Sequence, residues 1–263
     1  MNMETSIITS LQNPRVKQLV ALQQKSAERR RSGLFVVEGR REVERCIDGG
    51  YEVESVFVHP VRCPQLPALD PHTRVIEVND EVYSKIAYRG GTEGIMAIVR
   101  CKQNSLASLK LGPAPLLLVV ESVEKPGNLG AMLRSADAAA ADAVIVCDPL
   151  TDLFNPNLIR SSVGAFFSVP TVACTSDECI AFLKEHGIRI LTAQLQDSLP
   201  YYDTDMRSAT AIVMGTESTG LTQPWRQAAD AHIRIPMLGR VDSLNVSVSA
   251  AILMYEAVRQ RLS

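Results

Sequence analysis

The second half of the chain alternates short apolar runs with helix-like segments, and this rhythm constrains the fold more than any other feature. The apolar runs are LLLVV (116–120), AVIVC (143–147), VPTVA (169–173), IRILTA (188–193), ATAIVMG (209–215) and HIRIP (232–236). Helical segments are expected at 128–140, 156–165, 177–185 and 243–261. Near-continuous apolar strands that alternate with helices predict an α/β fold, with a parallel sheet covered on both faces.

A polar segment separates this region from a different N-terminal part. Residues 101–115 end in Gly-Pro-Ala-Pro, which resists both helix and central strand. Before it, strands are expected at 34–39, 53–59, 74–78 and 95–99, with helices beginning at Asn13-Pro14 and covering 41–48 and 79–87. For 263 residues two domains are the natural expectation, and we place them at 1–112 and 113–263.

The net charge hides an asymmetry between these two parts. The whole chain carries 27 Lys/Arg and 29 Asp/Glu, a net charge of −2, which excludes a strongly basic protein that coats nucleic acid. Residues 1–112 hold 16 Lys/Arg and 13 Asp/Glu (net +3), and residues 113–263 hold 11 and 16 (net −5). The densest basic clusters are Arg29-Arg30-Arg31 and Arg40-Arg41. Such clusters can bind phosphate groups, although a solvated helix face is the more common explanation for them.

The remaining compositional features indicate a cytoplasmic protein. The N-terminus lacks a signal-peptide pattern, and no apolar stretch is long enough to span a bilayer. Six cysteines are scattered without a C-x-x-C pair or zinc-ligand spacing. We therefore expect reduced, buried thiols and no metal site.

Three polar, glycine-containing segments follow predicted strands, where ligands of open α/β sheets bind. The first, ESVEKPGNLGAMLRSAD (121–137), joins a strand to a helix whose N-terminus suits an anion. Gly127 and Gly130 give only G-x-x-G, so a dinucleotide site remains a weak alternative. Arg134 lies on this helix among apolar residues, where a salt bridge or a phosphate contact would explain it.

The other two segments lie further along the chain. VMGTESTGL (213–221) runs from a strand into a loop that a ligand can approach closely. IPMLGRVDSLNVSVSAAI (235–252) leads into the last helix, and capping explains only one of Ser243 and Asn245.

The ordered set NLGAMLRSA, MGTESTGL and IPMLGRVDSLNVSVSAAI resembles the three motifs of the SpoU/TrmH family of RNA ribose 2′-O-methyltransferases, within the SPOUT superfamily. The resemblance covers about residues 116 to 261. The N-terminal part, with LFVVEG and GGTEGIMAIV, resembles the L30e-like substrate-binding domain often attached to this family. The resemblance implies a deep trefoil knot formed by the GTESTGL loop, the IPMLG loop and the final helix. It also implies a homodimer with active-site residues near the subunit interface.

The resemblance further implies S-adenosylmethionine as cofactor, bound in the knot largely through backbone groups. It assigns cofactor contacts to Gly215, Ile235 and Leu244, with Thr192 as a weaker candidate. It gives Arg134 the central catalytic role, supported by Asn128, Glu217, Ser243 and Asn245. No metal is implied.

The partner implied is RNA, with rRNA favoured over tRNA because tRNA-specific relatives often carry shorter extensions. Phosphate contacts are expected from Arg29, Arg30, Arg31, Arg40 and Arg41, and from the loop 89–94. A tRNA ribose methyltransferase, a non-catalytic RNA-binding scaffold and an NAD-dependent oxidoreductase remain as alternatives.

Overall fold

The computed structural model describes residues 6–88, 93–216 and 218–263, and the chain forms two compact units. The first unit holds the chain up to Lys102 together with Asp152–Phe167. The second unit holds Gln103–Thr151 and Ser168–Ser263. Within the described residues, no helix is both long and apolar enough to cross a membrane.

The division between the units falls before the Gly-Pro-Ala-Pro run, and so earlier than residue 112. The segment after Lys102 joins the second unit because Asn104 forms a β-bridge with Val172. Leu106, Leu109 and Leu111 then pack against the core of that unit. The Gly-Pro-Ala-Pro run therefore lies inside the second unit and does not mark its boundary.

The segment Asp152–Phe167 belongs to the first unit, although the residues on both sides of it in the sequence belong to the second. Phe154 packs on Phe35 with ring centroids 4.8 Å apart, and Phe167 packs edge-on against Tyr51 at 5.2 Å. Periodicity predicts the helix at this position but carries no information about which core it joins. The aromatic contacts decide that.

The first unit is built on a mixed sheet of five strands in the order β1-β4-β3-β5-β2. β1, β4 and β3 run parallel, and β5 pairs antiparallel with β3 and β2. The strands are β1 Ser6–Ile8, β2 Leu34–Glu38, β3 Val53–Val58, β4 Arg74–Val78 and β5 Ile95–Arg100. The helices are α1 Pro14–Gln24, α2 Ser26–Ser32, α3 Arg40–Asp48, α4 Asp80–Ile86, α6 Pro156–Ser161 and α7 Ala165–Ser168, the last of which ends in the second unit. α1 begins where the sequence predicts, with the Asn13 side chain accepting from Arg15 N.

The second unit is built on a seven-stranded sheet in the order β10-β12-β9-β11-β6-β7-β8. Every pairing between these described strands is parallel. The strands are β6 Leu116–Glu121, β7 Ala143–Cys147, β8 Thr171–Cys174, β9 Arg189–Ala193, β10 Leu199–Pro200, β11 Thr210–Met214 and β12 Ala231–Arg234. The helices are α5 Pro126–Ala138, α8 Ser176–Glu185, α9 Gln223–Ala228 and α10 Val246–Leu262, with short 3₁₀ turns η1 Leu106–Ser108 and η2 Tyr201–Asp203.

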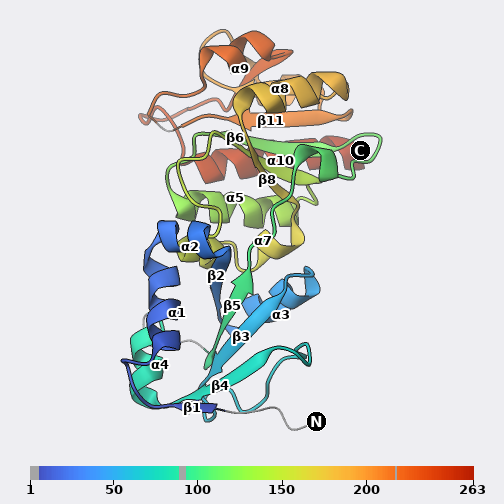
Figure 1. The fold of residues 1–263 in the computed structure, drawn as a ribbon. Coiled ribbons are helices and arrows are strands. Elements are labelled where there is room, and N and C mark those ends of the chain that lie inside the picture. Colours follow the sequence, from blue (N-terminus) through green and yellow to red (C-terminus); the bar gives the residue numbers. More distant parts are fainter. Residues whose placement is uncertain (1–5, 89–92, 217) are drawn as a thin grey trace. The chain divides into compact units, whose positions relative to one another are not determined.

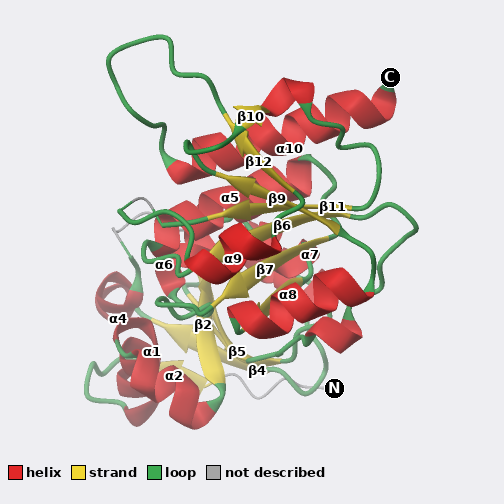
Figure 2. Ribbon diagram, turned by 90° about the horizontal axis from the view of Figure 1, so that it is seen from above, coloured by secondary structure: helices red, strands yellow, loops and turns green. Residues whose placement is uncertain are grey.

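Helices cover both faces of this sheet. Figure 1 shows α8 and α9 on one face and α5 and α10 on the other, and Figure 2 shows the same arrangement from above. The predicted parallel α/β fold is therefore confirmed. Strand β10 and helix α9 escape the sequence prediction because each is too short to show a periodic pattern.

Candidate functional site

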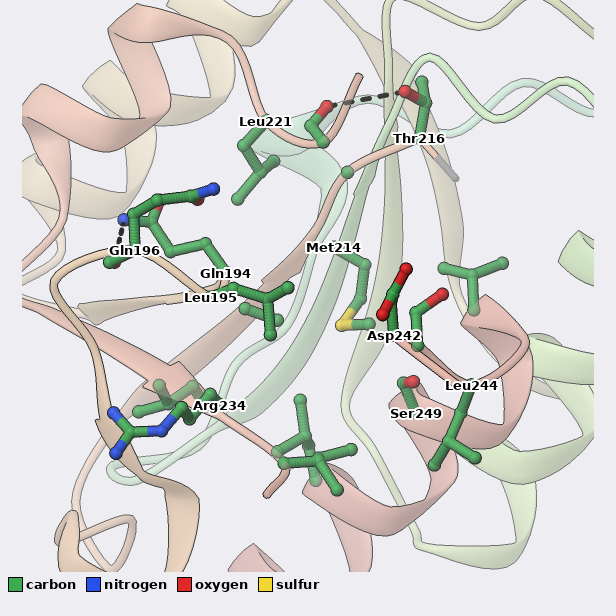
Figure 3. A pocket seen from close by; sticks show the side chains of 18 of the residues that line it. Gln194, Leu195, Gln196, Met214, Thr216, Leu221, Arg234, Asp242, Leu244 and Ser249 are labelled. Carbon is green, nitrogen blue, oxygen red and sulfur yellow. Dashed lines mark hydrogen bonds between the residues drawn. The ribbon is translucent and has the colours of Figure 1, made fainter. Parts of the chain in front are cut away.

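A cavity of about 370 Å³ lies at the carboxyl ends of β9, β11 and β12, beside the start of α10. Figure 3 shows Leu195, Met214 and Leu244 around it, with Asp242 and Ser249 on the side of α10. Loops from four separate segments of the chain meet here. The lining residues are Ala193, Gln194, Leu195, Gln196, Met214, Gly215, Thr216, Ser218, Thr219, Gly220, Leu221, Arg226, Ile233, Arg234, Ile235, Met237, Asp242, Ser243, Leu244, Val246, Ser249 and Leu253.

Most residues expected to contact the cofactor line this cavity. Gly215, Ile235 and Leu244 all do so, and Ser243 lies beside them. Thr192 does not. It is fully buried, and its hydroxyl lies 2.6 Å from Nδ1 of His232 on the neighbouring strand. Thr192 is therefore corrected to a core residue, and the lining begins one residue later.

Gly215 stands where the chain approaches itself too closely for a side chain. A Cβ atom here would press on the Gly220 carbonyl carbon and lie 2.5 Å from the Leu221 nitrogen. Thr216 N donates to Gly220 O at 3.3 Å, and Gly220 N donates to Thr216 O at 3.1 Å. The tight loop that borders the cavity therefore depends on glycine at this position.

A second cavity of about 170 Å³ shares Gly215 and Thr216 with the first. Asn128 at the start of α5 lines it, together with Lys125 and Val246. Asn245 Nδ2 donates to Asn128 Oδ1 at 3.3 Å, and Asn245 Oδ1 also caps α10 by accepting from Ser247 N. The fold thus brings the first and third motifs together, as the resemblance implies. Glu217 of the second motif lies outside the described residues.

Arg134 lies apart from both cavities. It is exposed on α5, while its neighbours Met132 and Leu133 are buried. Six residues of helix separate it from Asn128, about one and two-thirds turns, so the two side chains leave α5 in different directions. Within the described part of the chain, its guanidinium makes no ion pair. A single chain therefore does not assemble all predicted catalytic residues around one cavity.

Buried Glu121, at the end of β6, is a site residue that the motifs do not reveal. Its carboxylate accepts from the Thr222 backbone nitrogen at 2.9 Å and from the Thr222 hydroxyl at 2.5 Å. Ser176 extends this network, because it donates to Asp148 at 2.6 Å and accepts from Trp225 Nε1 at 2.9 Å. The one sequence feature that could have indicated this role is the position of a carboxylate as the last residue of an otherwise apolar strand.

Replacing Glu121 with glutamine is expected to lower the free energy of unfolding by about 1–3 kcal/mol, because an amide nitrogen would replace one of the two oxygens that accept from Thr222. Urea denaturation followed by circular dichroism measures this loss. Glu124→Gln, an exposed neighbour, is the matched control and should change stability by less than about 0.5 kcal/mol. Equal stability of the two variants would contradict the anchoring role of Glu121.

The larger cavity offers charges of both signs. Asp242 lines it on one side, and Arg226 and Arg234 line it elsewhere. Arg226 Nε donates to Leu221 O at 3.1 Å, so it also holds the end of the glycine loop. The cavity suits a small ligand that combines apolar surface with charged groups, and its volume is within the usual range for such sites.

The basic residues of the first unit divide into different environments. Arg29 is only 3% exposed, its Nε lies 2.6 Å from Asp152 Oδ2, and its guanidinium also donates to Leu22 O. Its expected role as a phosphate contact is therefore corrected to a structural one. The sequence does not predict this ion pair, because Asp152 lies more than a hundred residues after Arg29.

The other arginines expected to bind RNA are accessible to different degrees. Arg30, Arg31 and Arg41 are exposed, and Arg40 is half-buried. Arg31 pairs with Glu28 at 2.6 Å, Arg40 with Glu44 at 2.8 Å and Arg41 with Glu42 at 3.0 Å. Of the loop 89–94, residues 89–92 lie outside the described residues.

All six cysteines are free thiols, as expected. The sequence predicts no metal site, and in the structure Cys147, Cys174 and Cys179 place their sulfur atoms within 4.8 Å of one another. Sequence spacing does not reveal this group, since it joins two strand ends to a helix. Hydrogen bonds from the Cys147 and Cys179 thiols hold the pKa of Cys174 below its usual range.

Two family models match the chain. Residues 115–255 match the SpoU rRNA Methylase family, and residues 13–97 match the MRM3-like substrate binding domain. Among curated proteins, the chain is 30% identical to the 23S rRNA (guanosine(2553)-2′-O)-methyltransferase RlmP of Bacillus subtilis, over 94% of this chain and 97% of that protein.

Solved structures agree with these matches over nearly the whole chain. A crystal structure of an RNA 2′-O ribose methyltransferase is 39% identical, with a TM-score of 0.84, and covers 98% of this chain and 100% of that one. The AdoMet-bound rRNA methyltransferase from Sinorhizobium meliloti is 28% identical, with a TM-score of 0.89, over 98% and 99% of the two chains. The chain belongs to the SpoU rRNA methylase family.

Proposed function

We propose that this protein transfers a methyl group from S-adenosylmethionine to a ribose 2′-hydroxyl of ribosomal RNA. The observation that carries the proposal is the convergence of motif residues from three distant segments: Gly215, Ile235, Ser243 and Leu244 line one cavity, and Asn128 lines the cavity beside it. A packing role alone gives no reason for these polar and glycine-rich segments to meet.

The larger cavity fits S-adenosylmethionine in size and chemistry. Leu195, Met214 and Leu244 offer apolar surface for an adenine ring. Asp242 suits the ammonium group, and Arg226 or Arg234 suits the carboxylate of the methionine end. Backbone groups of the Thr216–Gly220 loop supply further hydrogen bonds at the cavity wall. When bound, the cofactor supplies the electrophilic methyl group.

The residues of the chain position the ribose and help its hydroxyl lose a proton. Arginine is too basic to accept that proton, so Arg134 acts by holding an RNA phosphate beside the hydroxyl. Asn128 and Asn245 are hydrogen-bonded to each other and hold the ribose or orient the arginine. Glu217 supports the arginine or the loop, and Ser243 completes the site.

A homodimer brings Arg134 of one subunit to the cavities of its partner. The exposed position of Arg134 on α5 supports this, as do the exposed apolar side chains of Val248 and Tyr255 on the neighbouring helix α10. The knot belongs to the same proposal. Its two loops and the start of α10 all border the larger cavity, which supports a threaded C-terminal segment around the cofactor.

The choice of rRNA rests on the N-terminal half. A substrate-binding domain model matches residues 13–97, and the similarity to a 23S rRNA methyltransferase extends over both halves of the chain. This domain selects the RNA, and the protein acts in the cytoplasm, where bacterial-type ribosomes are assembled. A tRNA substrate is the second candidate.

Isothermal calorimetry separates methyltransferase from dehydrogenase chemistry. S-adenosylmethionine and its demethylated product are expected to release or take up heat on binding. The Gly215→Ala variant is expected to bind them more weakly. NAD is expected to give no binding heat. Binding of NAD without S-adenosylmethionine would overturn the proposal.

Reversing the charges of Arg30 and Arg31 to glutamate is expected to weaken RNA binding and flatten its salt dependence. The slope of log affinity against log salt should fall by about one for each lost phosphate contact. Filter binding over a salt series measures it, with Arg207→Glu in the second unit as the control. An unchanged slope would assign both arginines to a solvated helix face.

A further inference from the structure

Three thiols lie together beneath α8 and line neither of the two cavities described above. Cys147 ends β7, Cys174 ends the adjacent edge strand β8, and the two are register partners. Cys179 lies on α8, which covers this face of the sheet (Figure 1). The three sulfur atoms lie within 4.8 Å of one another.

This spacing is close to what a metal ion requires. A metal–sulfur bond of about 2.3 Å places the three sulfurs of a trigonal site roughly 4 Å apart. The longest sulfur–sulfur distance therefore needs to shorten by less than 1 Å, which small changes in the cysteine side-chain torsions can supply. Three thiolates form a soft ligand set, which selects Cu(I) or Zn(II) over Mg(II), Ca(II) or Mn(II).

The number of donors distinguishes between the two soft ions. Among the His, Cys, Asp and Glu side chains of residues 6–88, 93–216 and 218–263, the group has three members and no fourth. Zn(II) in structural sites takes four ligands in a tetrahedron. Cu(I) has a filled d shell and a single charge, and it is satisfied by two or three thiolates.

The surroundings also suit a buried cation with an entry path. Cys147 and Cys179 are fully buried in the apolar core, while Cys174 is half-buried and reaches solvent. A bound ion would thus be shielded from water on one side and accessible on the other.

We propose that Cys147, Cys174 and Cys179 form a Cu(I)-binding site with three sulfur ligands. Binding replaces thiol protons with the metal ion, and those protons pass to solvent, so no change in oxidation state is involved.

The test uses the reduced full-length protein under anaerobic conditions, with Cu(I) supplied as its coloured bicinchoninate complex. The protein is expected to remove a single Cu(I) ion per chain from the dye. Cys174→Ser and Cys179→Ala should each weaken the affinity at least ~10-fold. Cys101→Ser, a half-buried cysteine of the first unit, is the matched control and should bind as the unmodified protein does.

Two further measurements use the unmodified protein and so do not depend on the folding of a variant. X-ray absorption at the copper edge of the unmodified protein should show three sulfur neighbours at roughly 2.3 Å. A parallel titration with Zn(II) and a zinc-sensitive dye should show weaker uptake. Zn(II) binding without Cu(I) binding, nitrogen or oxygen neighbours around copper, or equal affinity in Cys174→Ser and Cys101→Ser would each overturn the proposal.

Discussion

Replacing Arg134 with alanine is expected to lower the rate of methyl transfer by about 10²–10⁴-fold, the usual contribution of a group that assists proton removal. Affinity for S-adenosylmethionine should change little, because the proposed role of Arg134 is to hold an RNA phosphate and not the cofactor. Transfer of a radiolabelled methyl group to rRNA gives the rate, and calorimetry gives the affinity. Comparable rates for variant and unmodified protein would defeat the assigned role.

Two controls separate charge from position in this experiment. Arg134→Lys keeps the charge but loses the planar two-pronged contact with phosphate, and should recover only part of the rate. Mixed dimers test the shared site directly. If Arg134 serves the partner's cavity, dimers of one Arg134→Ala and one Gly215→Ala subunit should be more active than either parent, at a cofactor concentration too low for the Gly215→Ala subunit to bind. Failure to regain activity in stable mixed dimers would place Arg134 and the cavity on one chain.

Replacing Gly215 with alanine should have the largest effect on cofactor affinity. The added methyl group meets backbone atoms of Gly220 and Leu221, which cannot rotate away as a side chain could. Overpacking of this kind costs about 1–3 kcal/mol, which corresponds to a loss of affinity of roughly 5–150-fold if the strain falls on the bound loop. Calorimetry with S-adenosylmethionine measures the loss.

Gly112→Ala is the matched control, because a Cβ atom at Gly112 meets nothing within 4 Å and its φ is not positive. It should leave affinity and thermal stability unchanged. Gly215→Ala protein that binds the cofactor as tightly as the unmodified chain would show that the close approach of the loop is unimportant for binding.

The sequence predicts those parts of the site that depend on strand ends. Gly215 and Ile235 directly follow apolar strands of a parallel sheet, and parallel strands present their carboxyl ends at one edge. Their meeting at one cavity follows from that rule. The cofactor contact predicted for Thr192 is displaced by one residue, to Ala193. Successive side chains of a strand alternate between the two faces of the sheet, and strand periodicity alone does not say which face borders the cavity.

Features that depend on distant pairing could not be predicted. Arg29 looks like its neighbours in an arginine run, and only the return of Asp152 to the first unit buries it. Glu121 reads as the last residue of a strand until Thr222 reaches it from a distant loop. The three thiols are a similar case, because Cys147 is distant in sequence from Cys174 and Cys179 although the three sulfur atoms lie close together. Each case is a long-range contact between residues that are locally unremarkable.

The most direct test of the central claim is to map ribose 2′-O-methylation on ribosomal RNA incubated with the purified protein and S-adenosylmethionine. We expect one new 2′-O-methylated nucleotide in the ribosomal RNA, absent with the Arg134→Ala protein and absent without cofactor. Methylation of a base instead of a ribose, or of tRNA while rRNA stays unmodified, would contradict it.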